Sequence, residues 1–272
     1  MKCGLYEVNF NKTLIMGILN ATPDSFSDGG RYNSVEYAVK HAVKMIADGA
    51  DIIDVGGEST RPGHEPVPAK DEIARVVPVI KEVAANTAVP ISIDTYKAET
   101  AKRAVEAGAS IINDIWGAKK DPEIASVAAD LNVPIILMHN RDNRHYHSFI
   151  RDVLNDLYES ISIAKKAGVA DDQIILDPGI GFAKDQKENI EMMANLDRLV
   201  GLGYPVLLGT SRKRMIGTAL DLPVEERMEG TGATVCFGIQ KGCHIMRVHD
   251  VKEMSRMTAM MDVLMGKGNV DG

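Results

Sequence analysis

The stretch Asp48-Gly-Ala-Asp-Ile-Ile-Asp54 joins the end of an amphipathic segment to a short run of β-branched residues. Similar stretches recur at Ala107-Gly-Ala-Ser-Ile-Ile-Asn113 and at Lys241-Gly-Cys-His-Ile-Met-Arg247. Glycine readily adopts the left-handed conformation that ends a helix, so each stretch predicts a helix followed directly by a strand. Their repetition indicates a chain built from alternating helices and strands.

Eight apolar runs are spaced along the chain with room for one crossover helix between successive runs. They do not alternate with polar residues, which is typical of strands buried on both faces of a parallel sheet. Pro90, Pro134 and Pro205 each open a run, where a missing backbone N–H is tolerated. The runs are Leu14–Leu19, Asp51–Val55, Ile91–Asp94, Ile111–Ile115, Ile135–Met138, Ile174–Asp177, Val206–Gly209 and Ile245–Val248.

Eight such units in 272 residues predict an α/β fold, a single (β/α)8 TIM barrel. A doubly wound open sheet is the alternative, but its Gly-x-Gly-x-x-Gly fingerprint does not follow the first run. No low-complexity tract or linker divides the chain, so we expect one domain over residues 1–272. The clearest helix is expected to begin at Ser34 as N-cap and to stop at Gly49. Its predicted apolar face consists of Val35, Ala38, Val39, Ala42, Val43, Ile46 and Ala47.

The composition limits the binding partners and the cellular compartment that we expect for this chain. With 31 Lys and Arg against 38 Asp and Glu, the net charge is −7, which argues against a nucleic-acid partner. An anionic substrate would have to be held by locally placed cations. The three cysteines lack metal-type spacing and indicate reduced thiols. Without a signal peptide or an apolar run of about 20 residues, we expect a cytoplasmic protein and no membrane partner.

Polar residues follow nearly every predicted strand. The carboxyl ends of barrel strands form the active-site face of such enzymes, so this set predicts a shared site. Strand ends also attract Asp and Asn as turn formers, an alternative that accounts for Asp54 and Asp114 individually. The set is Asn20, Asp54, Asp94, Asn113, Asp114, His139, Asp177, Ser211, Arg212, Lys213, Arg247 and His249.

The loops of the predicted barrel suggest where ligands bind. Residues 20–30 and 56–68 are rich in Gly, Ser, Pro and Asp, which suits loops that close over a ligand. The loops after the seventh and eighth strands usually bind phosphate, and Lys213, Arg247 and His249 there offer donors to an anion. Arg212 beside them is equally well explained as surface charge.

Two further groups are expected to be structural. His139, His145 and His147 lie in one polar segment without a regular zinc spacing, and we interpret them as solvated loop residues. The methionines between Met254 and Met265 indicate a helix in the core or in a subunit contact.

The polar segments resemble, in order, the motifs of dihydropteroate synthase. The resemblance covers essentially the whole chain, and the ordered set is far more specific than any single motif. Two departures are Ala183, where the family usually has glycine, and Asn140 after the histidine. The matching segments are residues 15–30 and 53–63, Ile93-Asp-Thr-Tyr-Lys97, Ile112-Asn-Asp-Ile115, Leu137-Met-His139, residues 176–182, Ser211-Arg-Lys213 and Arg247-Val-His-Asp250.

The resemblance implies a transferase of folate biosynthesis. Such an enzyme condenses 6-hydroxymethyl-7,8-dihydropterin diphosphate with 4-aminobenzoate to give 7,8-dihydropteroate and diphosphate. The electron-rich ring can stabilise positive charge on the methylene carbon, so an SN1-like displacement is expected. The family also implies a homodimer and a target of sulfonamides, which mimic 4-aminobenzoate.

The resemblance also assigns roles to residues. Lys213, Arg247, His249 and Asp94 would be catalytic, and the pterin would be bound by Asp94, Asn113, Asp177 and Lys213. The diphosphate would be bound by Thr60, Arg61, Arg247 and His249, with Mg2+ held through Asn20. The 4-aminobenzoate would lie near Thr60, Pro62, Phe182, Ser211 and Lys213.

Two alternatives remain at this point. A catalytically silent pterin-binding paralogue would keep the fold without turnover. A pterin-binding methyltransferase domain would share the barrel but would have no need for Ser211-Arg-Lys213 or Arg247-x-His249.

Overall fold

The structure, a computed structural model, describes residues 1–21, 31–58 and 66–267. Eight parallel strands form one sheet in the order β8-β7-β6-β5-β4-β3-β10-β9. Between its two outermost strands, β8 and β9, the sheet is closed only by an isolated bridge of Leu176 to Val206 and a bond from Leu176 N to Pro205 O of 2.9 Å. The strands are β3 (Leu14–Asn20), β4 (Ile52–Gly56), β5 (Ile91–Asp94), β6 (Ile111–Asp114), β7 (Ile135–Met138), β8 (Ile174–Asp177), β9 (Leu207–Leu208) and β10 (Ile245–Val248).

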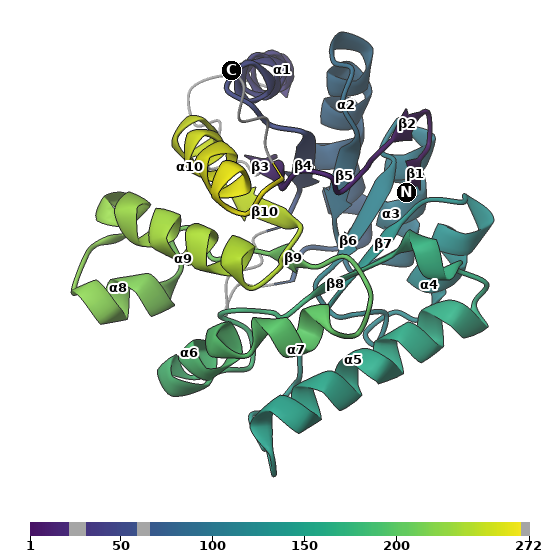
Figure 1. Cartoon of the computed structure of the whole chain (residues 1–272). Helices are drawn as coiled ribbons and strands as arrows, with labels where there is room; N and C mark the ends of the chain where they lie inside the picture. Colours follow the sequence, from purple (N-terminus) through teal and green to yellow (C-terminus); the bar gives the residue numbers. More distant parts are fainter. Residues whose placement is uncertain (22–30, 59–65, 268–272) are drawn as a thin grey trace.

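Helices surround this strand barrel (Figure 1). The TIM barrel predicted from the sequence is therefore confirmed, and the open-sheet alternative is wrong. Within the described part of the chain, no helix is both long enough and apolar enough to cross a membrane. The helices are α1 (Arg31–Ala47), α2 (Ala69–Asn86), α3 (Ala98–Glu106), α4 (Glu123–Asp130), α5 (Phe149–Lys166), α6 (Gln186–Ala194), α7 (Leu196–Val200), α8 (Arg214–Leu220), α9 (Met228–Gln240) and α10 (Val251–Leu264), with short 3-10 turns η2 (Asp171–Gln173) and η3 (Val224–Glu226).

Alternate residues of every strand except β5 belong to two separate cores. Ile53 and its counterparts pack outward against the helices, whereas Ile52 and its counterparts fill the barrel interior. Because side chains alternate along a strand, the residue two positions after each inner one also points inward. The inner layer consists of Leu14, Met16, Ile52, Ile111, Ile136, Ile175, Leu207 and Ile245, together with Cys3.

The next inward layer is polar. Two residues beyond Ile52, Ile111, Ile175 and Ile245 stand Asp54, Asn113, Asp177 and Arg247. Strand alternation thus places these polar side chains at the carboxyl end of the barrel interior, directly above the apolar layer.

Two features of the N-terminal region differ from the sequence-based expectations. A hairpin of β1 (Lys2–Cys3) and β2 (Tyr6–Glu7) was not predicted, and Tyr6 packs against the inner core cluster. Helix α1 begins at Arg31, so Ser34 lies inside it and is not its N-cap. Gly49 has φ +109° and does end this helical segment, as predicted.

The predicted face of α1 also needs two corrections. Val43, which is 46% exposed, and Ala47 lie outside the buried face, whereas Met45 is buried. Among the C-terminal methionines, Met254 is in the core, while Met257, Met260 and Met265 are exposed.

Candidate active site

Arg247 of β10 lies at the centre of the polar layer. Its Nε donates to Asp54 Oδ2 at 2.6 Å, and its Nη2 donates to Asp94 Oδ2 at 2.7 Å. Burial lowers the pKa of Arg247, but the two carboxylates raise it by more, so the guanidinium remains charged. The residue predicted to bind diphosphate is therefore also the cation that holds two strand-end carboxylates together.

Asp54 joins this cluster as an acceptor for two residues. Besides Arg247 it accepts a bond from Asn113 Nδ2, at 3.3 Å from its Oδ2, and it is completely buried. The interpretation of Asp54 as a turn former is wrong. It lies two residues beyond Ile52 on the same strand, so its side chain also points into the barrel. Asp114, which points to the other face, does bind its own turn through the N–H groups of Trp116 and Ala118 at 2.8 and 2.6 Å.

Asp94 carries an acceptor atom that is free for a ligand. Its Oδ1 is buried and has no hydrogen-bond partner among the described residues. Burial raises the pKa of Asp94 to about 7, with Asp54 adding to the rise and Arg247 opposing it. A buried acceptor without a donor is costly, and a ligand N–H would relieve that cost.

Asp177 and Lys213 form the opposite part of the site, across the β8–β9 closure. Asp177 Oδ1 accepts the Gly179 N–H at 2.7 Å, while Lys213 Nζ donates to Ile180 O at 2.5 Å. Burial raises the pKa of Asp177 and lowers that of Lys213 to about 8, and each residue opposes the shift of the other. A carboxylate and an ammonium near each other here supply an acceptor and a donor to one polar ligand.

Glycines leave room for the Lys213 side chain. A Cβ at Gly181, which has φ +87°, would lie 3.3 Å from Lys213 Cδ. The Phe182 ring centroid is 5.0 Å from Lys213 Nζ. The Lys213 ammonium therefore lies over the Phe182 ring, within the range of a cation–π contact.

Ser211 and His249 form a pair at the ends of β9 and β10. Ser211 Oγ accepts the His249 N–H at 3.1 Å and lies 2.9 Å from His249 Nδ1. The hydroxyl can donate to Nδ1, which leaves Nε2–H directed away from the pair. Next to them, Arg212 has φ +57° and binds Asp250 at 2.9 and 2.5 Å, so it is an ion-pair residue and not free surface charge.

The other predicted site residues are placed differently. Asn20 is exposed at the end of β3, which lies between β10 and β4 in the sheet. Thr60, Arg61 and Pro62 lie outside the described residues, so the structure does not place them. The interpretation of His139 as solvated is wrong, since its side chain is completely buried, whereas His145 and His147 are exposed.

Lys184 is a buried charged residue next to the site that sequence reasoning missed. It ends the glycine-containing segment that starts at Asp177, and it is 8% exposed. A buried lysine is rare without a partner, yet a sequence alone does not distinguish it from a solvated one.

The strand-end polar layer inside a closed barrel defines the class: an α/β-barrel enzyme that binds a small polar ring and an anion. The model of the family described as "Pterin binding enzyme" matches residues 16–249. The chain belongs to the dihydropteroate synthases, which are transferases within this family of pterin-binding enzymes.

Relatives support this membership along nearly the whole length. The chain is 64% identical to the dihydropteroate synthase of Bacillus subtilis over 259 residues, covering 95% of this chain and 91% of the relative. A dihydropteroate synthase from Clostridium difficile, solved in the presence of pteroic acid, matches with a TM-score of 0.92 and 46% identity over 95% of this chain and 99% of that one. The Yersinia pestis synthase, solved with a sulfonamide drug complex, matches with a TM-score of 0.92 and 36% identity over 98% of this chain and 99% of that one.

Proposed function

We propose that this chain condenses 6-hydroxymethyl-7,8-dihydropterin diphosphate with 4-aminobenzoate by an SN1-like displacement. The observation that carries this proposal is the buried Oδ1 of Asp94, which has no hydrogen-bond partner in the part of the chain that the structure describes and lies beside Arg247 and Asn113. Such an acceptor suits a heterocycle with N–H donors. It would remain unpaired beside an aromatic ring that lacks them.

The pterin would be bound from both sides of the barrel. Asp177 would accept the exocyclic amino group and the adjacent ring N–H, while Asp94 and Asn113 would pair with other ring atoms. Lys213 would donate to the ring carbonyl or to N5. Buried, charge-assisted bonds of this kind fix the ring and leave its methylene arm directed out of the barrel.

The chemical step then needs charge separation. The bond from the methylene carbon to the diphosphate oxygen breaks, and its electron pair leaves with the diphosphate. The nitrogen lone pair of 4-aminobenzoate forms the new C–N bond, and the amine proton passes to solvent. Two of the five Arg247 N–H donors are used by carboxylates, so others can bind a leaving-group oxygen, together with His249, Thr60 and Arg61.

We propose that Asn20 contributes one oxygen ligand to Mg2+. An exposed amide oxygen beside β10 would suit an ion that keeps most of its waters and takes few protein ligands. No cluster of three His, Cys, Asp or Glu residues that could hold a metal occurs among the described residues, so a closed protein cage is not offered there. Bound Mg2+ would neutralise charge on the leaving diphosphate.

The 4-aminobenzoate would lie on the outer side of the pterin. Phe182, Ser211 and the Lys213 stem would flank its ring, with Thr60 and Pro62 completing the position. A sulfonamide of similar shape would compete for this position.

The state of the protein in the cell follows the same proposal. We propose one catalytic domain over residues 1–272, a homodimer and a cytoplasmic location. Burial raises the pKa of Cys3 to about 11 and of Cys243 to about 12, so both are inert thiols. Exposed Met257, Met260 and Leu264 on α10 supply apolar surface for a subunit contact.

The proposed function is tested by measuring diphosphate release with both substrates, with each alone, and with Mg2+ replaced by chelator. We expect release only with both substrates and with Mg2+. A protein that binds the pterin but releases nothing would be the silent paralogue. Turnover unaffected by Mg2+ would exclude the role of Asn20.

A further inference from the structure

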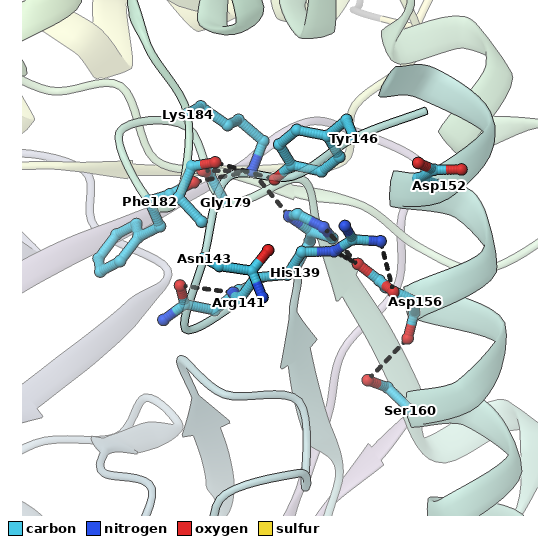
Figure 2. A network of polar contacts seen from close by, with 12 residues as sticks. His139, Arg141, Asn143, Tyr146, Asp152, Asp156, Ser160, Gly179, Phe182 and Lys184 are labelled. Carbon is cyan, nitrogen blue, oxygen red and sulfur yellow. Dashed lines mark hydrogen bonds and ion pairs between the residues drawn. The ribbon is translucent and has the colours of Figure 1, made fainter. Parts of the chain in front are cut away.

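Lys184 lies in a network of polar contacts next to the site (Figure 2). Its Nζ is 2.8 Å from His139 Nδ1. It also donates to two carbonyl oxygens of its own turn, Gly179 O at 2.9 Å and Phe182 O at 3.1 Å. An ammonium group has three donors, so each of them meets one acceptor.

His139 is held in the form that can accept this bond. Its Nε2 is 2.9 Å from Asp156 Oδ2, and Arg141 binds the same carboxylate at 2.5 and 3.1 Å. Since a carboxylate accepts, Nε2 carries the hydrogen and Nδ1 accepts from Lys184. Burial and the neighbouring Lys184 lower the pKa of His139 to about 4, which keeps the ring neutral.

The turn from β8 to α6 depends on side chains for its shape. Lys184 binds two of its carbonyls, Lys213 binds Ile180 O, and Tyr146 donates to Ala183 O at 2.8 Å. Ala183 has φ +46°, a left-handed conformation that favours glycine. The turn contains one backbone bond, from the Phe182 N–H to Gly179 O at 3.0 Å. Its other carbonyls are held by side chains, from Lys184 within the turn and from Lys213 and Tyr146 outside it.

The two ligand-facing residues of this turn are anchored unequally. Asp177 belongs to β8, and its carbonyl accepts the His139 N–H at 2.9 Å. Phe182 lies five residues further on, and its carbonyl is bound by Lys184. Loss of the ammonium group therefore releases Phe182 more than Asp177.

We propose that Lys184, with His139 as its acceptor, is a positioning residue that holds Phe182 against the 4-aminobenzoate. This inference rests on the function proposed above and adds a residue that touches neither substrate. The charged groups around Lys184 are Asp177 of β8, Asp156 of α5, Glu188 of α6 and Lys213. The three carboxylates favour the ammonium form, whereas burial and Lys213 oppose it and bring the pKa of Lys184 to about 7.

The test compares the change in KM for 4-aminobenzoate with the change in KM for the pterin. Lys184→Met should raise the KM for 4-aminobenzoate about tenfold and change the KM for the pterin less than about threefold, because one lost anchor is worth roughly one charge-assisted hydrogen bond. The control is Lys187→Met, the same change at an exposed position three residues along, which should change neither. His139→Gln keeps an acceptor for Lys184 and a donor for Asp156 and should retain the low KM, whereas His139→Leu should behave like Lys184→Met.

A second readout does not depend on turnover. Labelling with 4-fluorophenylalanine places a fluorine on each of the five phenylalanines, and Phe182→Leu identifies the signal of ring 182. We expect Lys184→Met to shift and broaden this signal alone, and the other four to stay in place. An unchanged signal, or equal KM changes for both substrates, would overturn the inference; an inactive wild type would instead refute the proposed function.

Discussion

At the scale of residues, the Arg247 guanidinium holds Asp54 and Asp94 together. Both carboxylates accept from Arg247, so one cation faces two acids. Asp54 uses its oxygens within the protein, whereas Asp94 keeps one oxygen for a ligand. The two neighbouring aspartates therefore have different tasks, one structural and one for binding.

Asp177→Asn should weaken pterin binding about a hundredfold. The amide can still accept the Gly179 N–H, but one of its two polar atoms becomes a donor that faces the donors of the ring. Calorimetry with 6-hydroxymethyl-7,8-dihydropterin measures the loss. Asp172→Asn, the same change at an exposed position in the adjoining turn, serves as the control. Normal affinity in Asp177→Asn would exclude this residue from the pterin site.

Asp94 should give pterin binding a pH dependence near neutrality. Its pKa, raised by burial to about 7, means that protonation removes the ionised acceptor as pH falls below 7. Affinity for 6-hydroxymethyl-7,8-dihydropterin should therefore decrease from pH 8 to pH 6, by up to about tenfold per unit below the pKa. Asp94→Asn should bind weakly throughout and lose this slope. An unchanged slope in the variant would assign it to another group.

The residues of the site were largely predictable, and the exceptions have physical reasons. Asp94, Asn113, Asp177 and Arg247 lie on predicted strands, and Lys213 follows β9 in the loop before α8. Their roles in binding stay predictions. Asp54 was misinterpreted because a strand-end aspartate looks alike whether it faces inward or outward. Only the assignment of Ile52 to the inner core decides between the two.

At the scale of elements, the eight strands were predictable to within a residue or two at most ends, because β-branched runs buried on both faces are unambiguous. The β1–β2 hairpin was not predictable, since its two-residue strands are too short to give a periodic signal. The predicted start of α1, with Ser34 as N-cap, was also wrong, because the helix begins at Arg31. The Lys184 turn could not be foreseen at all, because its shape depends on partners from two distant segments, one between β7 and α5 and one between β9 and α8.

The turn between β8 and α6 should be intolerant of a methyl group at Gly179. A Cβ there would lie 2.0 Å from His139 O, and its φ is +65°. Gly203 also has a positive φ, +87°, but a Cβ there would meet nothing within 4 Å. Gly203→Ala should cost roughly 1 kcal/mol for its backbone conformation alone, and Gly179→Ala about 3 kcal/mol or more. Urea unfolding of both variants measures the difference, and equal costs would contradict the close contact of turn and strand.

At the scale of the whole molecule, the buried His139 should make the fold sensitive to acid. Its pKa is about 4 in the fold and 6.5 when unperturbed, so below pH 6.5 the unfolded chain binds the proton more readily. Stability should therefore fall between pH 6.5 and pH 4, by about 3 kcal/mol from this residue. Relative to wild type, His139→Gln should lack this part of the acid loss in unfolding measurements across that range. Parallel pH curves for the two proteins would exclude the histidine as its source.

The barrel meets itself between β8 and β9 through a single bridged pair, Leu176 and Val206. Asp177 ends the strand on one side of this seam, and Lys213 follows the strand on the other. A pterin bound to both residues would bridge β8 and β9, the pair of neighbouring strands with the fewest backbone hydrogen bonds in the barrel. Amide deuterium uptake at residues 206–208 should therefore be among the fastest of the eight strands in the free protein and should slow selectively once the ring is bound. In this view the substrate completes the wall that encloses it.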